Sequence, residues 1–190
     1  MKQNLWISHL IILIISLTSC SYKVKEFTTD ELKWFKPFDK TDTIVFISEK
    51  NEWDSIIFQK AIATGDTSRS VEVGYYNMNF LTVAYEFSKW SYHQSAMMSD
   101  GKKRYEHHFI NMSKSSSDDN SIEITFIGTI FSDKTLKNIQ QIDSSNYFFE
   151  SEKGDYSGMN VEKGIKDFSF NTNVGIVSYT DNRSIKWKRR

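Results

Sequence analysis

The chain of 190 residues contains 24 Lys and Arg against 24 Asp and Glu, so its formal net charge is zero. This balance lacks the basic footprint that nucleic-acid-binding proteins usually carry, and we expect no nucleic-acid partner. Pro occurs once and Gly eight times, while aromatic residues make up 15% of the chain, which excludes a low-complexity or largely disordered protein.

The N-terminus has the layout of a secretory signal peptide. An apolar run from Leu5 to Leu17 follows Lys2 and ends at small residues near Ser19. A positive region, a short apolar region and a small-residue processing site are typical of such a signal. The run is shorter than the about 20 residues that a membrane-spanning helix needs. We therefore expect residues 1–19 to be removed.

The single cysteine of the chain directly follows this segment. Leu17-Thr18-Ser19-Cys20 resembles the bacterial lipobox, in which an aliphatic residue and small residues precede a cysteine that is lipidated before cleavage. The resemblance implies that Cys20 carries a diacylglycerol thioether and anchors the protein in a lipid bilayer of the cell envelope. Ser21 in the next position resembles the pattern that is sorted to the outer membrane. The alternative is an ordinary signal peptide followed by an incidental cysteine.

Processing at Cys20 would leave 171 residues with 23 basic and 24 acidic side chains. This length suffices for one domain with a sizeable core. We expect a tether over residues 20–27 and a single β-rich domain over residues 28–190. Because the one cysteine lies in the anchor, the domain can form no internal disulfide, and its stability must come from the core.

The first elements of this domain are a short helix and a hairpin. Thr28 and Glu31 have the spacing of a capping box, which predicts one or two helical turns that end by Pro37. The segment 42–63 then alternates apolar and polar residues around a turn expected at residues 50–52.

Two longer strands follow. The segment 77–93 places Leu81, Val83, Tyr85 and Phe87 on one face at period two. The segment 121–131 alternates in the same way, with an apolar face of Ile122, Ile124 and Phe126. The Ser-rich stretch 113–121 between these strands is interpreted as a solvated loop.

The last part of the chain predicts one helix and one hairpin. Leu136, Ile139 and Ile142 recur three residues apart behind Asp133, which predicts a short helix. In the segment 174–190, a two-residue turn at Asp181-Asn182 would place Ile176 opposite Trp187 and Ser178 opposite Ile185. The whole pattern predicts a mainly β fold, an antiparallel curved sheet or partly closed barrel with one or two short helices.

Two stretches of the domain resemble a known group of proteins. The segments "LKWFKPFDKTDTIVFIS" (32–48) and "VGIVSYTDNRSIKW" (174–187), together with the lipobox, resemble the small lipoproteins common in Bacteroidetes, a family without an established activity. The resemblance implies an envelope lipoprotein with a β-rich domain and names no chemistry.

The strongest pattern for chemistry surrounds Asp100-Gly101, a turn signal of β-hairpins. If this turn sets the register, His93 lies opposite His108, with Glu106 on the same face. Two imidazoles and a carboxylate at this spacing could hold a metal ion. The alternative is that these three are polar residues on a solvated sheet face.

The sequence contains no nucleophile elbow, zincin motif, P-loop or dinucleotide fingerprint, and we expect no cofactor. The leading interpretation is a non-enzymatic envelope lipoprotein whose domain binds a partner protein, an envelope component or a small ligand. One alternative is a membrane-tethered metal-dependent enzyme that uses His93, His108 and Glu106. Another is a carrier of a hydrophobic ligand, in which Tyr85, Phe87, Tyr92 and Phe109 line a cavity of the curled sheet.

Overall fold

The fold is seen in a computed structural model that describes residues 26–70, 74–87, 107–115, 120–132, 139–151 and 164–190. Two short helical elements come first, α2 (Thr29–Leu32) and the 3₁₀ turn η1 (Lys36–Phe38). Twelve strands follow: β1 (Asp42–Ser48), β2 (Trp53–Phe58), β3 (Ile62–Ser70), β4 (Gly74–Phe87), β5 (His107–Ser115), β6 (Asn120–Phe126), β7 (Thr129–Ser132), β8 (Ile139–Gln141), β9 (Asn146–Glu150), β10 (Ile165–Asn171), β11 (Gly175–Asp181) and β12 (Lys186–Arg189).

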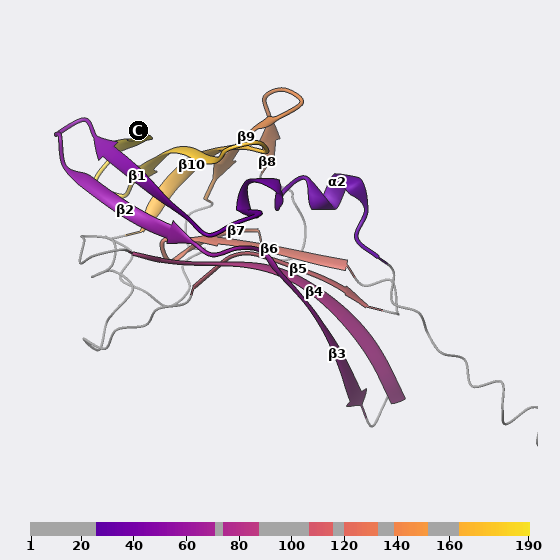
Figure 1. The fold of residues 1–190 in the computed structure, drawn as a ribbon. Coiled ribbons are helices and arrows are strands. Elements are labelled where there is room, and N and C mark those ends of the chain that lie inside the picture. Colours follow the sequence, from indigo (N-terminus) through magenta and orange to yellow (C-terminus); the bar gives the residue numbers. More distant parts are fainter. Residues whose placement is uncertain (1–25, 71–73, 88–106, 116–119, 133–138, 152–163) are drawn as a thin grey trace, which may run out of the picture.

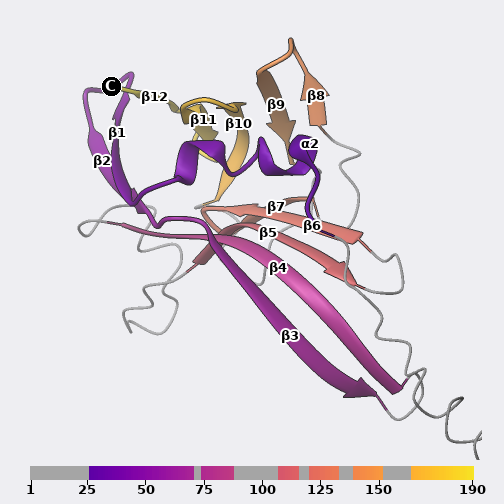
Figure 2. The ribbon, with the colours of Figure 1, turned by 45° about the vertical axis from the view of Figure 1, so that its right-hand side comes forward.

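All described strands belong to one antiparallel sheet. Its order is β7-β6-β5-β4-β2-β1-β12-β11-β10-β9-β8, and β3 pairs with β4 outside this path. Figures 1 and 2 show β4 to β7 in one layer, facing β8 to β11 in the other. The hairpin of β3 and β4 extends beyond both layers as an arm.

Contacts across the interior show how strongly the sheet curls. Phe126 on β6 and Phe168 on β10 lie far apart in the strand order, yet their ring centroids are 5.7 Å apart. The Thr129 hydroxyl at the start of β7 accepts a hydrogen bond from the Ile165 backbone N–H of β10 (3.1 Å) and donates to its carbonyl (3.2 Å). The sheet is therefore a half-barrel whose two layers share one core, which confirms the predicted fold class.

The N-terminal segment inserts between the two layers. Trp34 packs on Tyr147 of β9 at a centroid distance of 4.5 Å and on Phe170 of β10 at 5.5 Å. Phe38 contacts Phe58 of β2 at 5.4 Å. Because aromatic rings bury large apolar areas, this short segment contributes far more to the core than its length suggests.

Several predicted elements are confirmed. The Thr28 side chain caps α2, and its backbone N–H donates to the Glu31 carboxylate at 2.6 Å, as in a capping box. The hairpin of β1 and β2 turns at residues 49–52, where Asn51 takes a left-handed conformation with φ of 59°. On β4, Leu81, Val83 and Tyr85 are buried in the predicted alternation.

Two predicted elements are wrong within the described residues. Ile139–Gln141 forms strand β8 and not the end of a helix. The Ser-rich stretch read as a loop supplies strand residues on both sides of positions 116–119, and Ser113, Lys114 and Ser115 are buried. The Ser113 and Ser121 hydroxyls hydrogen-bond across β5 and β6 at 2.8 Å, so polar side chains satisfy one another inside the sheet.

The C-terminal hairpin exists, but its predicted register is wrong. Tyr179 lies opposite Trp187, and Ser178 lies opposite Lys188. The connection is longer than a two-residue turn because Asp181 organises it. Its Oδ1 accepts the Ile185 N–H at 2.9 Å, and Ser184 adopts a φ of 64°.

Candidate functional site

Of the residues predicted to carry chemistry, the structure describes only His108. Cys20, His93 and Glu106 lie outside the described residues. His108 is exposed on β5, next to the buried Phe109, so the predicted division of these two residues between opposite faces is confirmed.

His93, the predicted partner of His108, lies outside the described residues. On the edge of β5 that faces β4, His108 lies opposite Ala84, and a bulge follows because the next pair is Val83 with Ile110. The bulge places both Phe109 and Ile110 in the core, so the regular alternation of β5 is interrupted directly after His108. In the part of the chain that the structure describes, no three His, Cys, Asp or Glu side chains lie close enough to share a metal ion.

His108 borders an open cleft of about 590 Å³ on the outer face of β3, β4 and β5. Its other lining residues are mostly small or uncharged: Thr41, Gln59, Lys60, Ile62, Thr64, Thr82 and Ala84. Several polar groups of the lining already have partners, since Thr41 donates to Gln59 at 3.2 Å and Thr82 donates to Asn111 of β5 at 3.0 Å. This cleft offers one imidazole and one ammonium group without a facing carboxylate among its lining residues.

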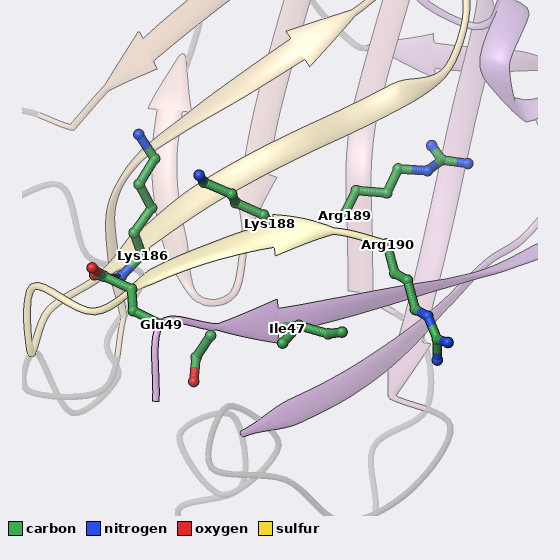
Figure 3. Close-up of a pocket in the computed structure, with 7 residues that line it drawn as sticks. Ile47, Glu49, Lys186, Lys188, Arg189 and Arg190 are labelled. Atoms are coloured by element: carbon green, nitrogen blue, oxygen red, sulfur yellow. Dashed lines mark hydrogen bonds between the residues drawn. The ribbon is translucent and has the colours of Figure 1, made fainter. Parts of the chain in front are cut away.

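A second cleft, of about 380 Å³, lies along β12 and has a different chemistry (Figure 3). It is lined by Ile47, Ser48, Glu49, Lys186, Lys188, Arg189 and Arg190. Four cationic residues thus line a single cleft together with one acidic residue, although the chain as a whole is neutral. This is a concentration of positive charge that the overall composition does not reveal.

Strand alternation arranges three of these cations in a row. Trp187 is buried, so Lys186, Lys188 and Arg190 share the outer face, and all three are exposed. Figure 3 shows them following one another along β12, beside Glu49 and Ile47. Arg189 belongs to the other face, and its guanidinium donates to the Val174 carbonyl.

The charge of this row is balanced at one end only. The Glu49 carboxylate accepts the Lys186 backbone N–H at 2.9 Å, which holds its negative charge beside Lys186. Asp167 on β10 lies at the same level of the sheet, because it pairs with Thr180, which pairs with Lys186. Within the described residues, neither Lys188 nor Arg190 forms a salt bridge.

Behind the row, on the inner face, a polar network fixes β12. Asp181 is fully buried, and its Oδ2 accepts from the Arg183 guanidinium at 2.8 Å and from the Trp187 indole N–H at 3.2 Å. Tyr179 stacks on Trp187 at a centroid distance of 5.7 Å. Burial raises the pKa of Tyr179, and the nearby Asp54 and Asp181 carboxylates raise it further. Asp181, Tyr179 and Trp187 are closed off from solvent, so we assign them a structural role.

At the other end of the domain, a second charged contact holds the N-terminal segment. Lys114 on β5 is buried, and its ammonium group lies 2.7 Å from a Glu31 carboxylate oxygen and donates to the Glu26 carbonyl at 2.9 Å. It also lies 5.7 Å from the centre of the Phe27 ring. Burial raises the pKa of Glu31, but hydrogen bonds from Lys114 and Thr28 outweigh this effect and lower the pKa overall.

Sequence reasoning missed the row on β12, although its signal is present. In "IKWKRR" (185–190), cations alternate around a single tryptophan, which is the pattern of a strand with one buried and one charged face.

No family model, curated protein or solved structure matches the chain. Among the described helices, none has the length and apolar character needed to cross a bilayer.

Proposed function

We propose that this protein is an envelope lipoprotein, anchored through acylated Cys20, whose single β domain acts as a non-enzymatic binding module. The observation that carries the proposal is the apolar run that ends in Leu17-Thr18-Ser19-Cys20, the only cysteine of the chain. Each buried CH₂ of an acyl chain contributes about 0.8 kcal/mol, so two or three chains give a stable anchor.

The attachment of the N-terminal segment supports this arrangement. Only residues 21–25 separate Cys20 from Glu26, the first described residue. From Glu26 onward, the segment is held on β5 by Lys114 and then enters the core through Trp34 and Phe38. A force that acts on the tether would therefore reach the sheet through these contacts.

The packing of the interior favours a binding module over a carrier of a hydrophobic ligand. Tyr85 and Phe109, two rings expected to line a cavity, are buried and lie 5.8 Å and 5.6 Å from the ring of Phe58. Phe38 from the N-terminal segment occupies the space beside them. These rings fill the core, so ligand binding is better served by the outer surface.

The proposal is tested by the intact mass of the protein in the membrane fraction of expressing cells. We expect the wild type to have the mass of residues 20–190 plus acyl chains, and Cys20→Ala to retain residues 1–19 or to leave the membrane. Ser21→Ala, which leaves the lipobox unchanged, is the matched control and should be lipidated. A wild type that is cleaved but carries no lipid would refute the anchor.

A further inference from the structure

The positive charges on the outer face of β12 form a single line and not a broad patch. Lys186, Lys188 and Arg190 repeat every second residue, so with a rise of about 3.4 Å per residue the row is about 14 Å long. On the β11 side, Lys186 and Lys188 lie opposite the uncharged Thr180 and Ser178. The row is therefore one strand wide.

The flank on the other side is apolar, with a half-buried Ile47 and an exposed Trp53. Ile47 of β1 lies opposite Lys188 on one side and opposite Trp53 of β2 on the other. Trp53 is 58% exposed, a large value for a tryptophan in a folded domain. A cationic row thus runs beside an aliphatic and an aromatic side chain on the same sheet face.

This arrangement discriminates between anionic partners. A planar anionic surface would press on Glu49 and Asp167 as well as on the cations, and these carboxylates would repel it. A linear polyanion can follow β12 from Lys188 to Arg190 and avoid them. If its backbone consists of sugar rings, their apolar C–H faces can pack on Ile47 and Trp53 while the acid groups pair with the cations.

We propose that the row Lys186, Lys188 and Arg190, with Ile47 and Trp53 beside it, is a binding surface for an acidic polysaccharide. The inference deepens the proposed function and rests on it, since a binding module anchored in the envelope needs a partner that is present there. The ligand class follows from the combination on one face: a line of cations, of which Lys188 and Arg190 form no salt bridge within the described residues, and an exposed aromatic ring. Binding should weaken as salt screens these surface charges.

The test uses the full chain, processed in cells and purified in a non-ionic detergent, with polymers immobilised on a biosensor at low ionic strength. The probes are polygalacturonate, polyglutamate as an acidic chain without sugar rings, and neutral dextran. The double variant Lys188→Glu/Arg190→Glu removes the centre and one end of the row. Lys40→Glu/Lys60→Glu makes the same change of net charge at exposed lysines outside it.

We expect polygalacturonate to bind the wild type, with dextran giving no signal. The row variant should lose affinity by about tenfold or more, while the control variant should stay within about twofold. Trp53→Ala should reduce binding of polygalacturonate and leave binding of polyglutamate unchanged. Equal losses in both double variants, or no binding of polygalacturonate, would overturn the proposal.

The design also distinguishes a polysaccharide from an acidic polypeptide, and it separates this inference from the proposed lipid anchor. Polyglutamate binding as tightly as polygalacturonate, with no effect of Trp53→Ala, would replace the polysaccharide by an acidic polypeptide and overturn the inference. Because the polymers report on the surface of β12 and the intact mass reports on Cys20, a failure of one experiment does not imply a failure of the other.

Discussion

Lys114 and Glu31 form a salt bridge of 2.7 Å in which the lysine side chain is 4% exposed and the glutamate side chain is 25% exposed. The two residues come from β5 and α2, so the pair joins the first described helix to the sheet. Placing a lysine in a buried position is costly unless its charge is paired. Here a carboxylate and the Glu26 carbonyl both accept from it, which compensates for the lost hydration.

Lys114→Ala should lower the free energy of unfolding by about 2 kcal/mol, measured by urea denaturation. The loss combines the broken charge pair with the packing of the lysine stem, and it stays below the value for a fully buried pair because Glu31 can be rehydrated. Lys33→Ala is the control, since its ion pair with Asp30 is solvent-exposed and should contribute about 0.5 kcal/mol or less. Equal effects of the two variants would contradict the role assigned to Lys114.

The same pair predicts a dependence of stability on pH. The pKa of Glu31 is lower in the folded protein than its ordinary value of 4.5, because hydrogen bonds from Lys114 and Thr28 outweigh the effect of burial. Its contribution to stability is therefore fully present above pH 4.5 and is lost as the pH falls through the folded pKa. We expect the unfolding temperature of the wild type to fall more steeply below pH 4.5 than that of Glu31→Gln. Parallel curves would exclude the contribution.

Removal of the hydroxyl group should change the free energy of unfolding differently at two buried tyrosines. The Tyr85 hydroxyl accepts the Ile127 N–H at 2.7 Å, at a turn where Ile127 has a φ of 48°. Tyr85→Phe leaves this buried donor unsatisfied and should cost about 1–2 kcal/mol in the free energy of unfolding. The Tyr147 hydroxyl is buried and has no hydrogen-bond partner among the described residues, so Tyr147→Phe should be neutral or slightly stabilising.

Tyr85 also predicts behaviour at alkaline pH. Burial raises its pKa, so the folded protein favours the neutral phenol. The stability that this provides is present below the ordinary tyrosine pKa of 10.0 and decreases as the pH rises above it. Denaturant unfolding of the wild type and of Tyr85→Phe at pH 8 and at pH 11 measures this term. A difference in stability that is the same at both pH values would count against it.

Where one face of a strand is apolar, the sequence was sufficient to predict the element. Leu81, Val83 and Tyr85 on β4 and Ile122, Ile124 and Phe126 on β6 follow a period of two and are buried. The capping box of α2 was readable for a different reason, because its two hydrogen bonds join residues only three positions apart.

Register and polar burial could not be predicted in the same way. A bulge on β5 makes Phe109 and Ile110 both face inward, and no residue type at this position predicts such a bulge. Ser113 and Lys114 have the composition of a loop, and their burial depends on partners on β6 and α2 that only the fold brings near. For the candidate site, the row on β12 was readable as an alternation, whereas the flank of Ile47 and Trp53 depends on strand order.

The metal-dependent enzyme can be tested against the binding module. If His93, His108 and Glu106 hold a metal, zinc titration of the full chain by calorimetry should show a site that disappears in both His93→Ala and His108→Ala. Because the described partner of His108 is Ala84, we expect zinc binding to be unchanged in both variants. His107→Ala on β5 is the matched control. The other remaining histidine, His9, does not serve as a control because it lies in the segment expected to be removed. A zinc site lost in both test variants and kept in the control would favour the enzyme.

Asp181 should be the most sensitive polar position of the C-terminal hairpin. Its carboxylate accepts from the Ile185 backbone N–H, the Arg183 guanidinium and the Trp187 indole, and the side chain is fully buried. Asp181→Ala leaves the buried N–H groups of Ile185 and Trp187 without their acceptor and removes the partner of the partly exposed Arg183, so it should lower the free energy of unfolding by about 3 kcal/mol or more. Asp181→Asn keeps the shape and one acceptor oxygen but not the charge that balances Arg183, so its loss should be smaller. Asp30→Ala, at an exposed carboxylate, should change stability little.

Since β12 is held in place by this network, Asp181→Ala should also weaken polygalacturonate binding. Asp181→Asn, which retains the Ile185 contact, should largely preserve this binding.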